Sequence, residues 1–545
     1  MENMDQHQSP LFRLPRELRD EIYGYYLHED GGYITSQSAQ RIQRLQRQDG
    51  RSIELGLSYA CKRVATEIEG LALKKNAIRF SVLPAKHESV SRYSTAGLFD
   101  YLLERRAGFC RVMLSHAYWL VSPEAMQAVR TRHPGNTAVE KLEKTIIRDG
   151  NYYLNQGHLH HFKMLDYVVG DVILHDLIQI IAENTDFELL TSKEYDPDVD
   201  VGPLYVDPDA NWDWRSEYSD IDDIGSISSD SDDGTTRSAF YSKETRDRVV
   251  EWRPAFWCMP QQQDLAEVAK FLPTSLQDLT HDDEGHELRL KQYFSAAAAA
   301  IHFLEHLGPK QRMHVRKIVI QEDHTSVGLP QTHARGLIPF CIENPDLRIE
   351  RRIDIWRTDF IPKSEHFSAD IPYIVSDVAK WISEARLLRI MGMPSTSFSL
   401  VLHGPTEEAS QQLCDAMIKA AIWHEGAQEV ARRTGSKWED YYGIAEDFVD
   451  VIKAMVRGDI PARFEADMGE VWDIEEILRD SEGDEPASAR EVFALENFEE
   501  PVGGWEAARA KYMEQTDWVD LEKSGRGLME GLMATMNYLD GTDVW

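Results

Sequence analysis

The sequence predicts a mixed α/β protein of several domains, on the basis of its length, the strands and helices that alternate in its second half, and an acidic segment that divides it. At 545 residues the chain is too long for one ordinary hydrophobic core, so two to four domains are expected. Apolar residues make up 42% of the chain, which is ample for burial. The predicted units are an N-terminal helical module (1–90), a helical block (91–195), an acidic disordered linker (196–236), an α/β domain (237–435) and an acidic helical C-terminal region (436–545).

Two helical patterns and a strand predict the N-terminal module. In the run LFRLPRELRDEIYGYYL (residues 11–27), Leu14, Leu18 and Ile22 recur at helical spacing, and Pro15 suits a first helical turn. Charged side chains, Arg19 among them, are then expected on the face toward solvent. A second apolar stripe over residues 57–71 predicts another helix, and residues 77–83 are rich in strand formers.

The helical block and the linker differ sharply in composition. Residues 92–190 keep a helical periodicity, whereas residues 196–236 hold thirteen acidic residues and a single basic one, Arg215. Such a segment buries too little apolar surface to offset the entropy of ordering it, so a disordered linker is expected. The linker serines followed by aspartates are candidate phosphorylation sites for acidophilic kinases, although serine and aspartate are also common in linkers. These candidates are Ser219, Ser229 and Ser231.

Strands separated by helices predict a parallel sheet in the α/β domain. The expected strands are 315–320, 348–356 and 397–402, and the expected helices are 333–343, 373–388 and 407–433. The strands are unequally spaced, which argues against a regular solenoid. An irregular sheet resembling leucine-rich repeats is the alternative to an ordinary α/β layer.

Charge and hydropathy exclude several classes of function. The net charge is −34, and because the first 150 residues are close to neutral, the remainder carries the whole acidic excess. Such a surplus repels phosphate backbones and anionic lipid, so neither nucleic acid nor membrane is an expected partner. No apolar run is long enough to span a bilayer, and the polar N-terminus does not resemble a signal peptide. With five scattered cysteines, this predicts a cytoplasmic or nuclear protein with reduced thiols.

The motifs of common enzymes are not found. There is no Walker A loop, dinucleotide fingerprint or nucleophile elbow. The histidines that could ligate a metal are His158, His160, His161 and His175, but the rest of a converging ligand set is not recognisable, so they are interpreted as ordinary histidines. His403-Gly404-Pro405 follows the third strand, where a loop can line a crevice, but three residues are too weak a signal to define a site. The sequence thus predicts no catalytic residue, metal or cofactor, and a protein that is not an enzyme.

The N-terminal motif resembles a known family. LPRELRDEIYGYYL followed by a Cys-Lys helix resembles the F-box-like module at the head of many fungal proteins, which commonly open with Leu-Pro-x-Glu-Leu-Arg-x-x-Ile-Tyr. F-box modules dock on the small adaptor subunit of a cullin-type ubiquitin ligase, while a downstream domain holds the substrate. The resemblance implies that Leu14, Pro15, Leu18 and Ile22 face the adaptor or support that face.

One departure from the family pattern is the insert over residues 28–56. It separates the two halves of the motif, where a compact F-box has a short link. Its repeated arginines around Ile42 and Leu45 are compatible with a short basic helix.

These observations favour a non-enzymatic adaptor that binds a common machine through its N-terminal module and a specific ligand through its α/β domain. A stand-alone scaffold that binds no ligase is the first alternative. An enzyme of unrecognised class within residues 240–545 is the second.

The linker yields a prediction from composition alone. We expect limited proteolysis of the native chain to cut first within residues 196–236, because proteases prefer unpacked segments. Mass spectrometry of the earliest fragments checks this. First cuts elsewhere, with this segment protected, would show that the acidic segment is docked on another part of the protein.

Overall fold

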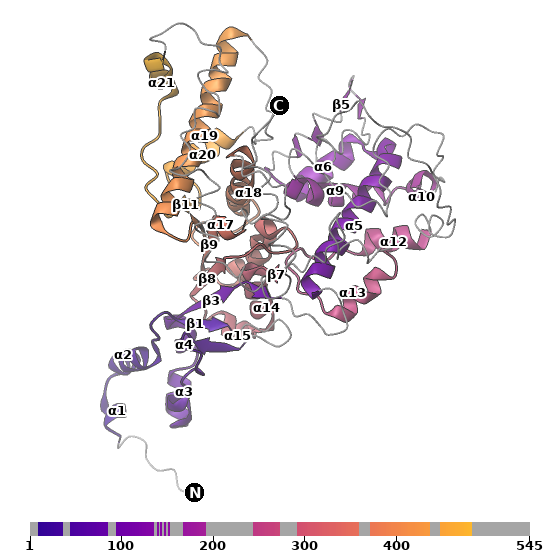
Figure 1. The fold of residues 1–545 in the computed structure, drawn as a ribbon. Coiled ribbons are helices and arrows are strands. Elements are labelled where there is room, and N and C mark those ends of the chain that lie inside the picture. The colour runs from indigo at the N-terminus through magenta and orange to yellow at the C-terminus, as the bar shows by residue number, and fades with distance from the viewer. Residues whose placement is uncertain are drawn as a thin grey trace, which may run out of the picture.

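The computed structural model describes residues 9–35, 44–84, 94–135, 139–140, 142–143, 147–148, 151–152, 167–191, 243–272, 292–358, 371–435 and 447–481 (Figure 1). The predicted linker with Ser219, Ser229 and Ser231 lies outside these residues, as do His158, His160 and His161.

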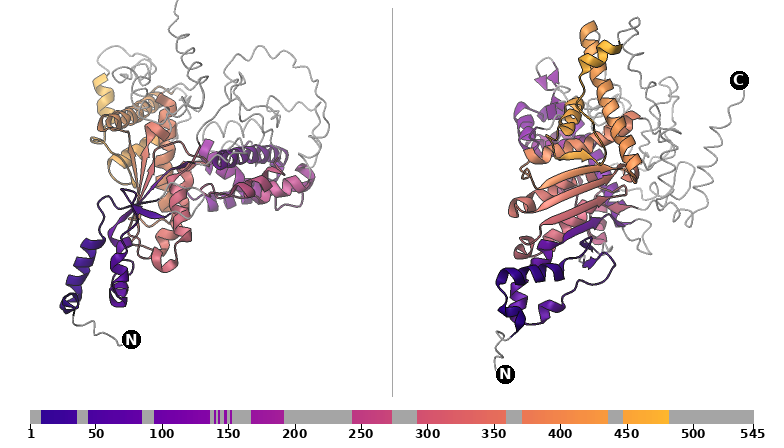
Figure 2. Two further views of the ribbon diagram at one scale, coloured as in Figure 1. Left: turned by 60° about the horizontal axis from the view of Figure 1, so that its bottom comes forward. Right: turned by 90° about the vertical axis from the view of Figure 1, so that its left-hand side faces the viewer.

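A seven-stranded sheet forms the centre of the protein, with the strand order β11-β10-β9-β8-β3-β1-β2. All neighbouring strands are parallel except β1 and β2, which are antiparallel. The right-hand view of Figure 2 shows the strands lying side by side. They are β1 (Tyr33–Thr35), β2 (Leu45–Arg47), β3 (Ala77–Ser81), β8 (Lys317–Glu322), β9 (Arg348–Asp354), β10 (Phe398–His403) and β11 (Ala462–Phe464).

The two faces of this sheet differ in chemistry. One face carries alternate residues such as Phe80, Ile320 and Leu400, which are buried. On the other face, the basic side chains of Arg79, Lys317, Arg348 and Arg463 are exposed. From β3 onward each new strand is added on the same side of the sheet, and since crossovers between parallel strands are almost always right-handed, the connecting helices gather on one face.

Helices cover the apolar face. The ring of Phe303 in α14 lies 5.5 Å from that of Phe80 in β3, and α18 contacts β10 and β11. The helices that follow β7 (Tyr293–Phe294) in the chain are α14 (Ala296–His306), α15 (Pro309–Arg312), η5 (Pro330–Leu337), α16 (Ile338–Glu343), α17 (Ile355–Thr358), α18 (Ile371–Ile390), α19 (Glu407–Thr434), α20 (Phe448–Val456) and α21 (Ile474–Ser481).

A second group of helices packs around α5 (Thr95–His116), which contacts α9, α10, α12 and α13 and stands beside the sheet in Figure 1. The group takes helices from both sides of the predicted linker, and β4 (Leu83–Pro84), just ahead of α5, pairs with β7. Its other helices are α6 (Pro123–Arg132), α9 (Tyr167–Ile181), α10 (Phe187–Thr191), α12 (Lys243–Glu251) and α13 (Gln262–Ala269). Three short elements, η3 (Tyr118–Leu120), β5 (Ile147–Arg148) and β6 (Asn151–Tyr152), complete this part.

The N-terminal helices form a small core of their own around Tyr23, Leu27, Val64 and Ile68. They project from the end of the molecule that carries the N-terminus (Figure 1). Their strand β3 pairs with β8 of the predicted α/β domain, so these two units share one sheet. The helices are α1 (Pro10–Arg13), α2 (Arg16–Leu27), η2 (Gly56–Tyr59), α3 (Lys62–Glu67) and α4 (Leu71–Lys75).

The predicted mixed α/β class, rich in helices and with a parallel sheet, is confirmed. Two local predictions in the N-terminal module are wrong. The helix expected over residues 57–71 is broken into η2, α3 and α4. The extended backbone of Cys61 separates η2 from α3, and Gly70 separates α3 from α4, since its φ is +70° and a Cβ there would stand 2.2 Å from the His314 ring. The described part of the insert forms strands β1 and β2 rather than a basic helix, and Arg47 of β2 pairs with Glu29 at 2.8 Å.

Among the described residues, no helix has the length and apolarity needed to cross a bilayer. All five cysteines lie within the described residues and carry free thiols, and Cys110, Cys341 and Cys414 are buried.

A buried ion pair joins the sheet to its covering helices. Glu322 of β8 and Arg351 of β9 are each 1% exposed, and Nη2 of Arg351 donates to Oε1 of Glu322 over 2.7 Å. The same carboxylate accepts hydrogen bonds from the backbone N–H groups of Ala296 (2.8 Å) and Ala297 (3.2 Å), at the positive end of α14. Arg351 also donates to the carbonyl of Pro330 in η5 and lies 4.7 Å from the ring centroid of Trp381 in α18.

This pair yields a stability prediction. Glu322→Gln should destabilise the protein by about 3–5 kcal/mol, because it leaves the Arg351 charge buried without its counterion. The matched control is Glu350→Gln, which breaks the more exposed pair with Arg352 on the other sheet face and should cost about 0–1 kcal/mol. Urea unfolding monitored by circular dichroism measures both. Equal costs for the two variants would contradict the role assigned to the buried pair.

Candidate partner-binding surface

The helix α2 carries the sequence motif and is held in place from one side. It begins after Pro15, which occupies the N-cap position without a side-chain cap. The side chains that pack inward from it include Arg19 (6% exposed), Tyr23 (0%) and Leu27 (4%). The expectation that Arg19 faces solvent is therefore wrong, and its physical reason is a partner on α3.

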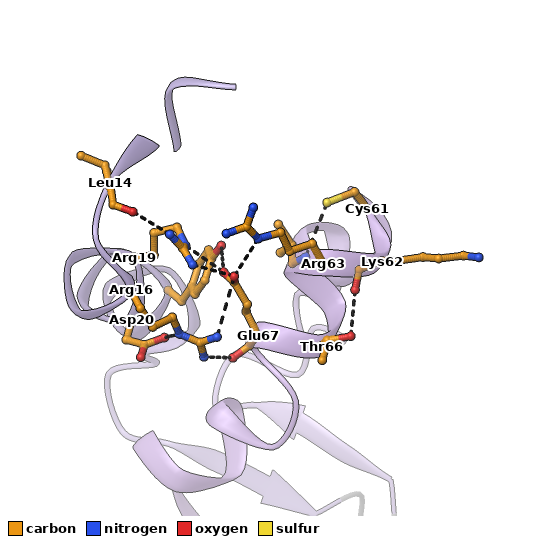
Figure 3. Close-up of polar contacts among 11 residues, drawn as sticks. Leu14, Arg16, Arg19, Asp20, Cys61, Lys62, Arg63, Thr66 and Glu67 are labelled. Carbon is orange, nitrogen blue, oxygen red and sulfur yellow. Dashed lines mark hydrogen bonds and ion pairs between the residues drawn. The ribbon is translucent and has the colours of Figure 1, made fainter. Parts of the chain in front are cut away.

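Arg19 forms a two-pronged ion pair with Glu67 of α3, shown in Figure 3. Its Nε donates to Oε2 over 2.9 Å and its Nη2 donates to Oε1 over 2.7 Å. The hydroxyl of Tyr23 donates to the same carboxylate over 2.9 Å, and Nε of Arg63 does so over 3.1 Å. Nη1 of Arg19 also binds the carbonyl of Leu14 at 2.6 Å, so this one side chain fixes both α3 and the start of α2.

These contacts perturb the Glu67 carboxyl. The hydrogen bonds from Arg19 are the largest cause that lowers its pKa to about 2, against a smaller opposing effect of burial. The carboxylate form is favoured by every donor around it. Protonation of Glu67 at low pH therefore weakens the contact between α2 and α3.

An adjacent face of α2 leaves its apolar side chains exposed. Leu18, Ile22 and Tyr26 follow one another at a spacing of four residues and are 45%, 44% and 43% exposed. Pro15 is also exposed, whereas Leu14 is half-buried. Of the sequence-predicted residues, Leu18 and Ile22 lie on α2, Pro15 is its N-cap and Leu14 precedes it as the C-cap of α1. Three of the four are exposed.

The second half of the module extends this exposed surface. The hydroxyl of Tyr26 lies 3.6 Å from the position that a Cβ on Gly56 would occupy, which places η2 beside the helix. Six of the twelve large apolar side chains that are exposed among the described residues belong to this module: Leu18, Ile22, Tyr25, Tyr26, Leu55 and Tyr59. Exposed apolar side chains gathered in one small module commonly mark a protein interaction site.

His175, the other candidate site residue within the described part, is not arranged as a metal ligand. It lies against Arg106, whose guanidinium donates to its ring. Burial is the larger cause that lowers the pKa of His175 to about 3, and the positive charge of Arg106 is the second. The neighbouring Asp176 instead binds His133, with Nε2 of the histidine 2.7 Å from Oδ2. Within the described ranges, no group of three or more His, Cys, Asp or Glu side chains is placed to hold a metal ion.

Sequence reasoning did not find Arg19 and Glu67, since charged residues on an amphipathic helix ordinarily face water. The one signal available was that α2 has apolar residues on two faces, Leu18 with Ile22 on one and Tyr23 with Leu27 on the other.

Comparison with protein-family models, with curated proteins and with solved structures gives no match in any of the three.

The ion pair predicts an acid-sensitive module. Because the folded-state pKa of Glu67 lies near 2 and its ordinary value is 4.5, its stabilisation is present above pH 4.5 and is lost as the pH falls toward 2. Hydrogen exchange should show that α2 and α3 lose protection in that window before the sheet does.

Variants separate Glu67 from the other carboxyl groups that titrate in the same window. Glu67→Gln should lower the protection of α2 and α3 already at neutral pH, whereas Glu69→Gln, at an exposed position two residues on, should not. Unchanged protection in Glu67→Gln would show that the contact does not depend on this charge.

Proposed function

We propose that this protein is a non-enzymatic interaction protein whose N-terminal module binds a partner protein through the exposed face of α2. The observation that carries the proposal is the row of Leu18, Ile22 and Tyr26, exposed on a helix whose other face is already packed. Burying these three side chains needs a second molecule, because the module's own core is filled from the Tyr23 side. Large apolar and aromatic side chains are typical anchors of protein interfaces.

The resemblance of residues 11–83 to F-box-like modules indicates the partner. On that ground we propose the adaptor subunit of a cullin-type ubiquitin ligase, with Leu14, Pro15, Leu18 and Ile22 at or beside the contact. The ion pair of Arg19 with Glu67 holds the helix in place, and a helix fixed before binding loses little conformational entropy on meeting any partner.

The α/β part would then hold the recognised substrate. In this proposal the sheet is an irregular relative of leucine-rich repeats, because its strands from β3 to β11 follow one another in order. Its polar face, with four exposed basic side chains, is the natural contact surface, since the other face is filled by helices.

The test uses the full chain and the purified ligase adaptor. Leu18→Ser with Ile22→Ser should weaken binding by about thirtyfold or more, because anchor residues typically contribute 2 kcal/mol or more. Both positions are exposed, so thermal unfolding should stay close to that of the wild type. The matched control is Ile342→Ser on α16, an isoleucine that is 58% exposed and far from the module in sequence. Isothermal titration calorimetry measures all three proteins.

The outcomes distinguish the competing interpretations. Wild-type protein that does not bind the adaptor at micromolar concentration would leave the stand-alone scaffold, with the same exposed face available to another protein. Adaptor binding that survives the double substitution would place the contact elsewhere on the chain.

A further inference from the structure

A cavity of about 750 Å³ lies where β8, β9, β10 and β11 end. Residues from the last positions of these strands line it, together with Arg357 of α17 and the first turn of α19. In open sheets of parallel strands, ligands bind beyond the carboxyl ends of the strands. The cavity is on the sheet, away from the N-terminal module and its exposed helix.

His403 is the most informative side chain in the lining. It is the last residue of β10, is 8% exposed, and stands in register beside Asp354 of β9. Its Nδ1 lies 2.9 Å from the carbonyl oxygen of Gly404. Because a carbonyl only accepts, Nδ1 carries a hydrogen, and Nε2 of the neutral ring is an acceptor. This Nε2 is buried and has no hydrogen-bond partner in the part of the chain that the structure describes.

The charged groups of the lining are mostly acceptors too. Four carboxylates, from Asp354, Glu407, Glu465 and Asp467, face one guanidinium, that of Arg357. Arg357 lies 3.5 Å from Asp354, and Glu465 is paired with Arg352. Burial raises the pKa of Asp354 to about 6, and the positive charge of Arg357 opposes this shift without offsetting it.

Two backbone N–H groups beside the cavity already have partners. The N–H of Gly404 donates to Oγ of Ser410 over 2.9 Å, and that hydroxyl donates to the carbonyl of Thr406 over 2.9 Å. The Thr406 side chain caps α19 by accepting from the N–H of Ala409, and the helix begins with Glu407 and Glu408. One N–H group of the first turn of α19 is therefore already bonded, and the two acidic side chains at the start of the helix disfavour an anion there.

We propose that this cavity binds a cationic nitrogen group, an ammonium or a guanidinium, which donates to Nε2 of His403 and to the carboxylates of Asp354 and Glu407. Nε of Arg357 is the one buried side-chain donor in the lining without a hydrogen-bond partner among the described residues. The acceptors outnumber it, since Nε2 of His403 and four carboxylates face the cavity, and a cationic group supplies both donors and positive charge to them. Two sources share this chemistry, a free amine and a lysine or arginine side chain of a bound protein. This site is independent of adaptor binding, so it stands or falls separately from the proposed function.

Calorimetric titration of the full chain tests the proposal without any adaptor present. The probes are agmatine and 1,5-diaminopentane for free cations, and acetylated, amidated Gly-Arg-Gly and Gly-Lys-Gly for side chains. Neutral controls replace the basic residue by citrulline or norleucine, and inorganic phosphate is the anion control. The titrations are run at moderate salt, because a chain of net charge −34 attracts any cation weakly.

Matched variants assign the binding to the cavity. Glu407→Gln, in the lining, should weaken binding about tenfold or more, as should His403→Phe, which keeps a ring but removes the acceptor. Glu408→Gln removes the same charge from the next position of α19, outside the lining, and should change affinity less than twofold. Thermal unfolding checks that each variant is folded. Because Glu407 is exposed, Glu407→Gln should leave the fold intact.

Each result either supports or overturns the proposal. Binding of the free amines alone identifies a small-molecule site, and binding of the basic peptides alone identifies a site for a protein side chain. The proposal is overturned if neither class binds, if phosphate binds instead, or if Glu407→Gln and Glu408→Gln weaken binding equally.

Discussion

The buried contact between Glu322 and Arg351 is the interaction on which the rest of the fold depends. It lies in the apolar face of the sheet, where each charge needs the other to offset the loss of hydration. Through it, two neighbouring strands, the start of α14, the η5 turn and the Trp381 ring of α18 are tied to one point. Hydrophobic contacts alone would allow the helices to slide on the sheet, whereas directional hydrogen bonds to a charged pair fix their registration.

The N-terminal module also depends on a shielded ion pair, which here sets the orientation of a helix. Arg19 and Glu67 also form a shielded pair, but here the pair turns α2 so that its apolar row points away from the module core. Exchanging the faces of this helix would place Leu18 and Ile22 inside and leave the module with an ordinary charged surface. The exposed face is thus a consequence of which residue meets Glu67, and the geometry of one arginine determines where a partner can bind.

The sequence predicted the long elements and missed features that depend on distant partners. Strands β8 and β10 are nearly continuous runs of strand-forming residues, and helices α18 and α19 are long, so local pattern was sufficient to find them. The alternation in β9 was obscured because Arg351 occupies a buried position among isoleucines, and nothing in the local sequence reveals Glu322 across the sheet. Strands β1, β2 and β11 have three residues each, too few for a periodic signal.

The candidate sites differ in the same way, since one is contiguous in the sequence and the other is assembled from distant residues. The motif around Leu14, Pro15, Leu18 and Ile22 was visible because it is contiguous, although its orientation was not. The cavity was almost invisible, since its lining comes from the ends of four strands scattered between Gln321 and Asp467. Of those residues only His403-Gly404-Pro405 drew notice, and the Asp354 carboxyl beside it becomes informative only once the strand register is known.

The pairing of β3 with β8 has a consequence for how the chain is made. Ala77 pairs with Lys317, so at synthesis rates of about 5–20 residues per second β3 waits on the order of ten to fifty seconds for its neighbour to emerge. In that interval β1 can already pair with one edge of β3, with β2 on its far side, while the other edge of β3 stays open. An unpaired strand edge is a site where nascent chains associate wrongly, and the shortness of β3, with the charged Arg79 at its middle, limits that hazard until the sheet is complete.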